Sequence, residues 1–377
     1  MNKSKPKIAI VHDFLIKLGG AEKVLEVLHE MYPDAPIYTI LYDESGTRGV
    51  FDKKEYNIIP SCLQKYSGFI RKRSKLLLSK FPSAIESFNL TKYDIVITSS
   101  NSFSHGAITK PTAKQICYCY SPMRYVWDWY NEYLEENKIG FGLFGIYIRN
   151  LFSRTRVWDY NISERTDKWI AISKTVAKRI KKYYRTNSSV IYPPTDMENL
   201  DIAAEPTLDY YLIISRLSPY KKIDLAVEAF NQSGKKLKIV GEGSEINKLK
   251  SMSKANIEFL GFRNENEKIQ LLQNCKALIF PGEEDFGLTP VEAMACGRPV
   301  IAYGKGGVTE TVVDGVTGMF FYDDTPESLN NAVNQFESEI DKFKPEVCRS
   351  RAELFSKDRF ITEFKKIVND SFATNHS

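Results

Sequence analysis

The sequence lacks any long hydrophobic run. No stretch of eighteen consecutive apolar residues occurs, and the N-terminus, MNKSKPKIAIVHDF, has no apolar core of the kind found in secretory signal peptides. We therefore expect a protein that neither crosses a bilayer nor is secreted. The six cysteines show no spacing typical of a disulfide framework, which fits reduced thiols in the cytoplasm.

Patterns that bind metals or dinucleotides are also missing. The four histidines are scattered along the chain, and no Asp-x-Asp pair is present to hold a divalent ion on a diphosphate. No G-x-G-x-x-G follows the first strand of either half. The sequence therefore predicts a protein without a metal or a cofactor.

Net charge is distributed unevenly. Residues 1–200 hold 30 Lys or Arg against 20 Asp or Glu, a net charge of +10, so the remaining 177 residues carry −5 of the total of +5. A basic half indicates a nucleic acid, an anionic lipid or a phosphorylated substrate as partner. Because no nucleic-acid-binding motif occurs, we expect no nucleic acid among the partners.

The most informative stretch is CKALIFPGEEDFGLTPVEAMACGRPVIAY, residues 275–303. Its two short apolar runs predict buried parallel strands, and the segment between them predicts a loop and a brief helix. Thr289 suits the N-cap of that helix, Pro290 its first position, and Glu292 the third residue of a capping box. Gly297 would end it.

This order places the loop 282–288 at the carboxyl end of a strand and the amino end of a helix, where open α/β sheets bind ligands and helix dipoles favour phosphate. Glu284 and Glu292 flank the same spot. Because two carboxylates would repel a phosphate, they suit a different task, which is to accept hydrogen bonds from sugar hydroxyls. The residues alone leave open that Glu292 only caps the helix and that Glu284 is a solvated loop charge.

The string EDFGLTPVE at 284–292 resembles the E-x7-E signature of glycosyltransferase family 4, retaining nucleotide-sugar transferases of GT-B architecture. The longer string to Gly318 resembles in particular the bacterial O-antigen and capsule mannosyltransferases of that family. The resemblance implies that Glu284 holds donor-sugar hydroxyls and Glu292 the ribose hydroxyls. It also implies that backbone groups of Phe286, Gly287, Leu288 and Thr289 meet the donor. The triplet Asp285-Phe286-Gly287 also occurs in kinases, but no other kinase motif accompanies it.

Near the N-terminus, residues 7–12 predict a buried strand, and a glycine turn then opens a helix over 21–31. The family is similar here, with H-D-x-L followed by G-G-A-E. The resemblance implies donor or catalytic roles for His12, Asp13, Gly19 and Gly20, with Glu22 as a further candidate. A core histidine at position 12 stays open.

The segment CYCYSPMRYVWD at 117–128 resembles a family segment that usually reads C-H-T-P-M-R-Y-x-W-D. Tyr120 stands where a histidine is common, which puts any acid-base role at that position in doubt, although a phenol can still donate a hydrogen bond. Arg124 and Asp128 are candidates for binding the acceptor, or form an internal ion pair.

The second half alternates strands and helices, as in a Rossmann-like domain. Its polar loops include RLSPYKK at 216–222, similar to the family's R-L-S-P-x-K, in which the two basic residues contact the donor diphosphate. Arg216 and Lys221 are therefore expected to clamp that group. The resemblance also implies that Gly243, in the turn 241–243, lies near the nucleotide base.

The fold class expected is α/β, specifically GT-B with two Rossmann-like, doubly wound domains facing a central cleft. The length of 377 residues suits two domains. We expect an acceptor-binding domain over 1–196, a linker over 197–206, a nucleotide-sugar domain over 207–355, and a C-terminal helix over 356–377 that crosses back to the first domain.

Two segments of the basic half mix aliphatic, aromatic and basic residues. Residues 61–88 predict a basic amphipathic helix, and residues 139–152 a short apolar piece followed by Arg154 and Arg156. Each suits contact with an anionic membrane surface. Alternatives are a solvated face for the first, and a core helix or an acceptor groove for the second.

The family resemblance implies a retaining, metal-independent hexosyltransferase that moves mannose from GDP-mannose to a polyprenyl-diphosphate-linked glycan in surface polysaccharide synthesis. The catalytic residues would be Arg216, Lys221, Glu284, His12 and Asp13. The protein would be cytoplasmic and peripheral on the inner face of the cytoplasmic membrane. GDP-rhamnose or a UDP-sugar remain alternative donors. A sugar-nucleotide-binding subunit without transfer activity is a rival of another class, and a GT-B epimerase or phosphorylase a further one.

Overall fold

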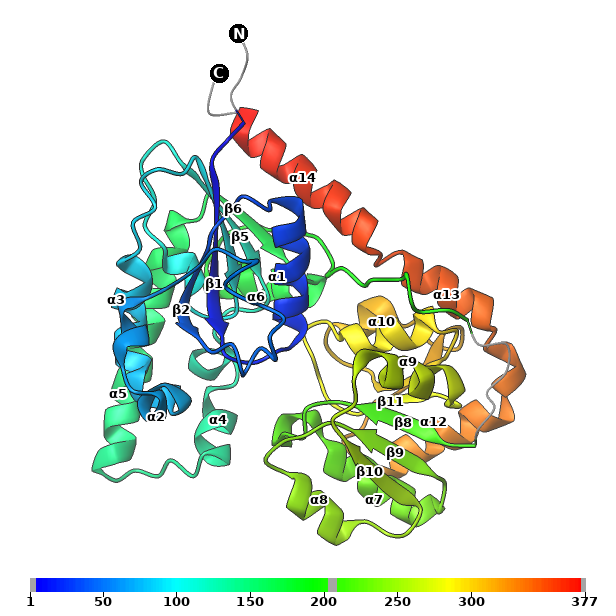
Figure 1. Cartoon of the computed structure of the whole chain (residues 1–377). Coiled ribbons are helices and arrows are strands. Elements are labelled where there is room, and N and C mark those ends of the chain that lie inside the picture. Colours follow the sequence, from blue (N-terminus) through cyan, green and yellow to red (C-terminus); the bar gives the residue numbers. More distant parts are fainter. Residues whose placement is uncertain (1–4, 203–208, 374–377) are drawn as a thin grey trace. The chain divides into compact units, whose positions relative to one another are not determined.

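The computed structural model describes residues 5–202 and 209–373, which fall into two compact units (Figure 1). The N-terminal unit comprises Met1–Tyr192 with Ile361–Ser377, and the C-terminal unit comprises Pro193–Phe360. The division lies at residue 192, before the expected boundary at 196, and the chain returns at 361 instead of 356. Residues 197–202 of the expected linker belong to the C-terminal unit, while 203–208 lie outside the described residues.

The N-terminal unit is built on a seven-stranded parallel sheet with the order β3-β2-β1-β4-β5-β6-β7. Its second and fourth strands in the sequence are buried along their whole length, as expected for strands covered on both faces. The strands are β1 (Ile8–Leu15), β2 (Ile37–Tyr42), β3 (Ile58–Pro60), β4 (Ile95–Ser100), β5 (Lys114–Cys119), β6 (Lys168–Ala171) and β7 (Ser189–Val190).

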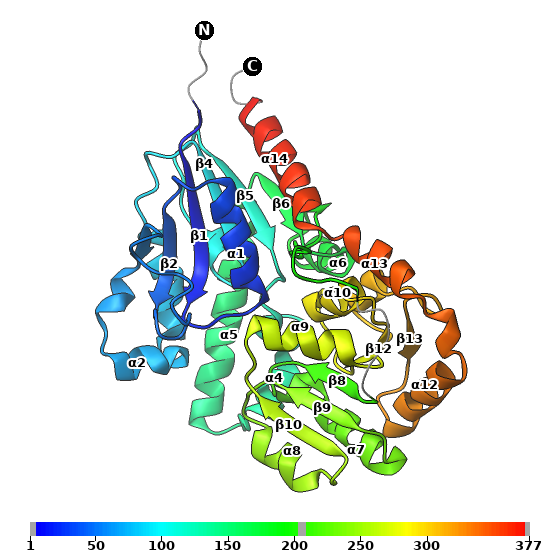
Figure 2. The same cartoon turned by 45° about the vertical axis from the view of Figure 1, so that its right-hand side comes forward.

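Helices cover both faces of this sheet (Figures 1 and 2). One hydrophobic core joins Ala9 and Val11 of β1 to Phe81 and Phe152, which lie on helices of one face. The helices of this unit are α1 (Gly20–Met31), α2 (Gly68–Lys72), α3 (Phe81–Glu86), α4 (Tyr130–Glu136), α5 (Leu143–Ile162) and α6 (Lys174–Tyr183).

The C-terminal unit carries a six-stranded parallel sheet with the order β10-β9-β8-β11-β12-β13. Its strands are β8 (Tyr211–Ile214), β9 (Leu237–Val240), β10 (Ile257–Gly261), β11 (Leu278–Phe280), β12 (Val300–Tyr303) and β13 (Gly318–Phe321). Its helices are α7 (Ile223–Ser233), α8 (Ile246–Met252), α9 (Glu265–Asn274), α10 (Leu288–Ala295), α11 (Val308–Thr311), α12 (Pro326–Ser338) and α13 (Pro345–Glu353).

Both sheets start in the middle, grow to one edge, and then return to the middle to grow to the other. This is the doubly wound order of Rossmann-like domains, in which the strand order reverses at a switch point. The switch point lies between β1 and β4 in the N-terminal unit and between β8 and β11 in the C-terminal unit. The expected class, two Rossmann-like α/β domains, is confirmed.

The last helix, α14 (Lys357–Ala373), begins in the C-terminal unit and continues in the N-terminal one. There the ring of Phe364 packs edge-on against Tyr118 of β5, with ring centroids 6.0 Å apart. Both side chains are fully buried. The C-terminal helix therefore contributes to the core of the N-terminal unit.

The sequence prediction for residues 61–88 was wrong in one respect. The segment is not a single helix but a succession of short pieces: η1 (Cys62–Lys65), α2, η2 (Ser74–Lys80) and α3. Gly68 and Pro82 interrupt the pattern, since glycine costs backbone entropy and proline lacks a donor. Residues 143–152, by contrast, are the first half of the long helix α5.

Candidate functional site

The site predicted in the second half lies at the switch point of the C-terminal sheet. The loop 215–222 follows β8, and the loop 281–287 follows β11, so both leave neighbouring strands at their carboxyl ends. In doubly wound sheets this is where ligands bind. The structure thus brings together two loops that are separated by more than fifty residues in the sequence.

Lys221 and Glu284, one from each loop, form an ion pair. The ammonium of Lys221 also lies 5.0 Å from the ring centroid of Tyr220. Both members of the pair are partly exposed, so the charges face solvent on one side. Arg216 has an exposed side chain, and the structure shows no ion pair for it among the described residues. The side chains of Arg216 and Lys221 therefore place two cations at this edge of the sheet, together with the carboxylate of Glu284.

Backbone hydrogen bonds hold the neighbouring loops to these two. The N–H of Leu217 donates to the carbonyl of Glu242 at 2.9 Å, and the N–H of Gly307 donates to that of Glu284 at 2.7 Å. A Cβ on Gly243 would lie 2.0 Å from the carbonyl oxygen of Leu217, so only glycine allows this close approach. The loops 215–222, 241–243, 281–287 and 304–307 are thus in contact along one edge of the sheet.

The helix after the second loop, α10, starts differently from the prediction. Its N-cap is Gly287, with φ of 87°, and no side chain caps the helix. Thr289 is instead its second residue and Pro290 its third, so the predicted capping box is absent. Glycine is needed because other residues rarely adopt this conformation. The uncapped first turn leaves backbone N–H groups that favour an anion.

Two of the predicted site residues are buried within α10 and its loop. Glu292 is buried in the helix, and Phe286 packs edge-on against Phe355 with ring centroids 5.7 Å apart. Phe286 can therefore meet a ligand only through its backbone. Leu288 and Thr289 are half-buried at the start of the helix. The two carboxylates of the E-x7-E motif thus differ in setting: that of Glu284 lies in a loop and is partly exposed, and that of Glu292 is buried in a helix.

In the N-terminal unit, a chain of hydrogen bonds crosses the switch point. The Nδ1 atom of His12 lies 2.9 Å from Oγ of Ser99, which lies 2.9 Å from the hydroxyl of Tyr120. That hydroxyl also donates to the carbonyl of Ala21 at 3.0 Å. All three side chains are buried. Burial raises the pKa of Tyr120 well above its usual value, so the phenol stays protonated.

Asp13, the residue after this histidine, binds backbone. Its two carboxylate oxygens accept four N–H groups, from residues 101–104, at 2.6–2.9 Å. The side chain is buried. Because a carboxylate offers about four acceptor positions, Asp13 is saturated by the loop after β4. The structure therefore shows that Asp13 holds that loop, and its catalytic role stays a prediction.

The glycine pair opens α1 as predicted. Gly19 is its N-cap and Gly20 its first residue, and no side chain caps the helix. Glu22, in the first turn, places a carboxylate oxygen 3.5 Å from Nε2 of His12. His12 is thus held between Glu22 and Ser99. This favours a fixed imidazole at the carboxyl end of β1.

Arg124 and Asp128 pair with each other, at 3.4 Å, and Asp128 also pairs with Arg179 of α6 at 3.1 Å. Two guanidinium groups thus share one carboxylate. The Nη1 atom of Arg179 donates to Oγ of Ser121 at 3.3 Å as well. Sequence reasoning named the first two residues but missed Arg179, because nothing local links positions that lie fifty residues apart.

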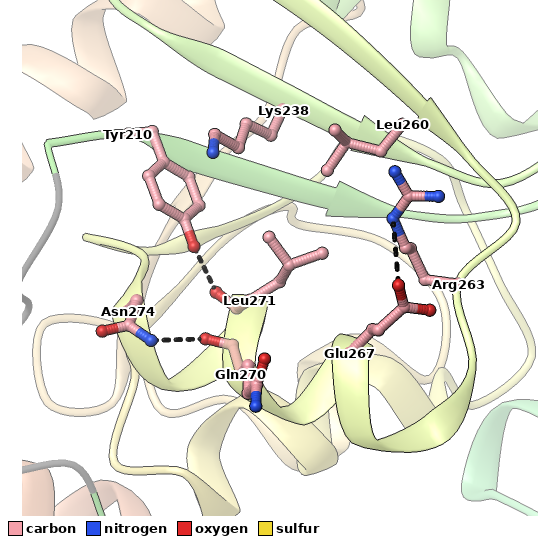
Figure 3. Close-up of a pocket in the computed structure, with 8 residues that line it drawn as sticks. All are labelled: Tyr210, Lys238, Leu260, Arg263, Glu267, Gln270, Leu271 and Asn274. Atoms are coloured by element: carbon pink, nitrogen blue, oxygen red, sulfur yellow. Dashed lines mark hydrogen bonds and ion pairs between the residues drawn. The ribbon is translucent and has the colours of Figure 1, made fainter.

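A separate pocket of about 300 Å³ lies in the C-terminal unit (Figure 3). Its lining comprises Tyr210, Lys238, Leu260, Arg263, Glu267, Gln270, Leu271 and Asn274. Its polar groups bond one another, as when the hydroxyl of Tyr210 donates to the carbonyl of Leu271 at 2.8 Å. No predicted site residue lines this pocket. Within residues 5–202 and 209–373, no group of three His, Cys, Asp or Glu side chains is placed to hold a metal ion.

Most of the second half matches a known family model. Residues 198–353 match the family model described as "Glycosyl transferases group 1". Sequence similarity extends to an uncharacterized glycosyltransferase of Methanocaldococcus jannaschii, which is 26% identical over 212 residues, or 54% of this chain and 60% of that protein. The alpha-1,3/1,6-mannosyltransferase ALG2 of Dictyostelium discoideum is 30% identical over 210 residues, 43% of this chain and 50% of ALG2. The matched regions span 50–60% of these relatives.

Solved structures match nearly the whole chain. Sucrose-phosphate synthase from Thermosynechococcus elongatus superposes with a TM-score of 0.77 at 17% identity, covering 97% of this chain and 99% of that one. Anabaena HepE in complex with UDP and glucose gives 0.71 at 18% identity, covering 97% and 100%. At such identities the likeness establishes the fold alone, which is of the GT-B type.

Proposed function

We propose that the protein is a retaining glycosyltransferase that uses a nucleotide-sugar donor. The observation that carries this proposal is the Lys221–Glu284 pair beside exposed Arg216 and the uncapped start of α10, within the residues that match the glycosyl transferases group 1 family. Cations and free N–H groups suit the diphosphate of the donor, and the carboxylate suits hydroxyls of its sugar.

The chemistry proposed is transfer of the glycosyl group with the nucleoside diphosphate as leaving group. Negative charge that develops on the diphosphate would be met by Arg216, Lys221 and the N–H groups of residues 286–289. Such preorganised stabilisation typically contributes about 3 to 4 kcal/mol per donor. The acceptor hydroxyl can then pass its proton to the departing phosphate, so the scheme requires no dedicated base.

The ion pair does not prevent Lys221 from binding phosphate. An ammonium has three N–H donors, so it can donate to Glu284 and to a phosphate oxygen together. In this proposal Glu284 holds the ammonium in place and accepts a sugar hydroxyl with its other oxygen. Glu292 would bind the ribose hydroxyls, which requires its buried carboxylate to face the ligand.

Mannose from GDP-mannose is the donor we propose first. Its support is the resemblance of the sequence to mannosyltransferases and the similarity to ALG2, whose name states that activity. The alternatives are GDP-rhamnose and a UDP-sugar, the second because HepE was solved with UDP and glucose. The acceptor proposed is a polyprenyl-diphosphate-linked glycan, as in bacterial surface polysaccharide synthesis.

The acceptor diphosphate would meet the cluster of Arg124, Asp128 and Arg179. Two guanidinium groups lie beside the carboxylate of Asp128, and guanidinium groups suit the oxygens of an anionic group. An Arg179→Ala variant should therefore raise KM for the lipid-linked acceptor while stabilisation by nucleotide stays unchanged. An unaltered KM would remove this cluster from the acceptor site.

The proposal is tested by a thermal-shift and turnover panel with GDP, UDP, GDP-mannose, UDP-glucose and UDP-N-acetylglucosamine, with and without a lipid-linked acceptor extract. Stabilisation by GDP and GDP-mannose, with GDP released only when acceptor is present, is the expected result. If only UDP and UDP-sugars stabilise the protein, a UDP-sugar would take the place of GDP-mannose as the proposed donor.

A second candidate function is a sugar-nucleotide-binding subunit without transfer activity. It is favoured by Tyr120, whose hydroxyl bonds inside the protein at a position where the resembling family usually has a histidine. Nucleotide stabilisation without release of GDP under any acceptor would support it. Slow hydrolysis of the donor in the absence of acceptor would count against it.

A further inference from the structure

The first turn of α5, with the residues before it, projects unusually many apolar side chains into solvent. Phe141, Leu143 and Phe144 are 81%, 90% and 69% exposed, and Ile146 and Tyr147 about half. We call residues 141–147 the apolar tip. Single exposed apolar residues are common on protein surfaces, but a cluster of this kind marks an interaction site.

The apolar tip is held in a defined shape. The guanidinium of Arg149 donates to the carbonyls of Gly140 and Ile139 at 3.2 and 3.4 Å and lies 4.3 Å from the ring centroid of Phe141. One turn further on, Ile148 packs against the core of the N-terminal unit, and Phe152 belongs to that core. The protruding turn is thus the end of an anchored helix.

A second exposed apolar pair lies on the interrupted segment 61–85. Phe69 is 64% exposed and Leu76 69%. As at the apolar tip, an arginine covers the aromatic ring, because the guanidinium of Arg73 lies 4.0 Å from the ring centroid of Phe69. Both views show α2 and the start of α5 at the same end of the N-terminal unit (Figures 1 and 2).

The charges of the two segments differ. Residues 61–85 contain six Lys or Arg and no acidic residue. Around the apolar tip, the four basic residues of 137–158 are nearly balanced by the three glutamates of α4. The electrostatic attraction therefore comes mainly from 61–85 and the apolar contact mainly from the tip.

From this arrangement we infer that the apolar tip and segment 61–85 form one docking surface for an anionic lipid bilayer. The aromatic and aliphatic side chains would enter the boundary between headgroups and acyl chains, and the basic residues would lie at the lipid phosphates. No helix in the described parts of the chain is long and apolar enough to cross a bilayer. Binding at the surface needs none. The inference does not depend on the proposed transferase activity.

The experiment is sedimentation of the full chain with vesicles of neutral lipid and with vesicles that contain about a third anionic lipid. Three variants are compared with the wild type. The tip variant carries Phe141→Ser, Leu143→Ser and Phe144→Ser, which leaves Ile148 in the core. The charge variant carries Lys65→Gln and Arg73→Gln. The control variant carries Ile340→Ser, Val347→Ser and Leu354→Ser, which are exposed apolar residues of the C-terminal unit.

We expect the wild type and the control variant to pellet with anionic vesicles. The tip variant should bind them roughly tenfold more weakly, and the charge variant should lose the preference for anionic over neutral lipid and the sensitivity to salt. Wild-type binding by the tip variant, or no binding by the wild type, would overturn the inference. Light scattering tests whether the protein forms a dimer without lipid. A dimer that the tip substitutions convert to a monomer would also overturn the inference, because the partner would then be a second copy of the chain. Thermal melts of every variant, with and without GDP, separate these outcomes from misfolding and from a failed nucleotide site.

Discussion

The ammonium of Lys221 and the carboxylate of Glu284 form an ion pair between two loops that follow adjacent strands, β8 and β11. These loops flank the switch point of the C-terminal sheet, so the pair marks the position where a doubly wound fold binds its ligand. It also links the two sequence motifs, R-L-S-P-x-K and E-x7-E, on which the proposed function rests. Its members are therefore the first to test.

Replacing either cation should reduce turnover strongly. We expect Arg216→Ala and Lys221→Ala each to lower turnover by roughly a hundredfold or more, because each removes a charge that stabilises the leaving diphosphate. Melting temperatures should stay near that of the wild type, since both groups are at the surface. The control is Lys222→Asn, which removes a neighbouring charge paired with Asp324 and suits the left-handed backbone there. Wild-type turnover in both test variants would disprove the clamp.

Neutralising the carboxylate should separate binding from transfer. In Glu284→Gln the ammonium of Lys221 loses its anionic partner and is free for phosphate, so stabilisation by GDP should stay equal or increase. Turnover should fall by roughly tenfold or more, because a hydrogen-bond acceptor for the donor sugar is weakened. Thermal shift and initial rates measure the two effects, and Glu283→Gln is the neighbouring control. Weaker GDP binding with unchanged turnover would contradict the assignment.

The hydroxyl of Tyr120 should matter for stability more than for chemistry. Tyr120→Phe leaves the carbonyl of Ala21 and the hydroxyl of Ser99 without this buried partner, which should cost about 1 to 2 kcal/mol in the free energy of unfolding. Denaturant titration gives that value. Turnover should drop by less than roughly tenfold if the residue only positions His12 through Ser99. A loss of several decades would show that the phenol acts on the substrate.

A methyl group at Gly243 should disturb the nucleotide site. Gly243→Ala would push the added carbon against the carbonyl of Leu217, 2.0 Å away, and so displace the loop that carries Arg216 and Lys221. We expect about 1 to 3 kcal/mol of destabilisation and a clear loss of stabilisation by GDP. The matched variant is Gly234→Ala, which has a positive φ but meets no atom within 4 Å. It should lower stability while leaving GDP binding intact.

Glu337 provides a pH-dependent test of the C-terminal fold. Burial alone would raise the pKa of Glu337, but hydrogen bonds from Lys235 at 2.5 Å and Tyr211 at 2.8 Å outweigh it and hold the pKa below its usual value. A lowered carboxyl pKa stabilises the fold above the unfolded value of about 4.3, and this contribution is lost as the pH falls through the folded value. Glu337→Gln should therefore be about 1 to 2 kcal/mol less stable than the wild type at neutral pH. The difference should shrink below about pH 4. A difference independent of pH would contradict this account.

Much of the fold could be predicted from local patterns. The strand expected over 7–12 is β1, which continues to Leu15, and the two apolar runs of 275–303 are β11 and β12, because apolar runs closed by glycine, proline or polar residues are local signals. The amphipathic pattern at 61–88 led to the wrong prediction of a single helix. It indicates which side chains share a face, but it does not show where the backbone of the helix is interrupted. The capping box at Thr289 is absent because the tight turn at Gly287 already starts the helix two residues earlier than predicted.

The site residues divide in the same way. Arg216, Lys221 and Glu284 could be named as candidates because each stands in a motif beside a strand end. Ser99 and Arg179 were missed, since their partners, His12 and Asp128, lie far away in the chain. The bonds from four backbone N–H groups of residues 101–104 to Asp13 were also missed, because such contacts leave no trace in the sequence.

By itself, the sequence determined that the chain has two α/β halves, where their strands run, and which loops carry cations and carboxylates. These features follow from contacts between residues that are close in the chain. Only the tertiary structure decided that Lys221 meets Glu284, that Tyr120 joins His12 through Ser99, and that the apolar tip is exposed while Ile148, half-buried, packs against the core. Those relationships depend on strand order and packing, which bring distant residues together and which no local pattern records.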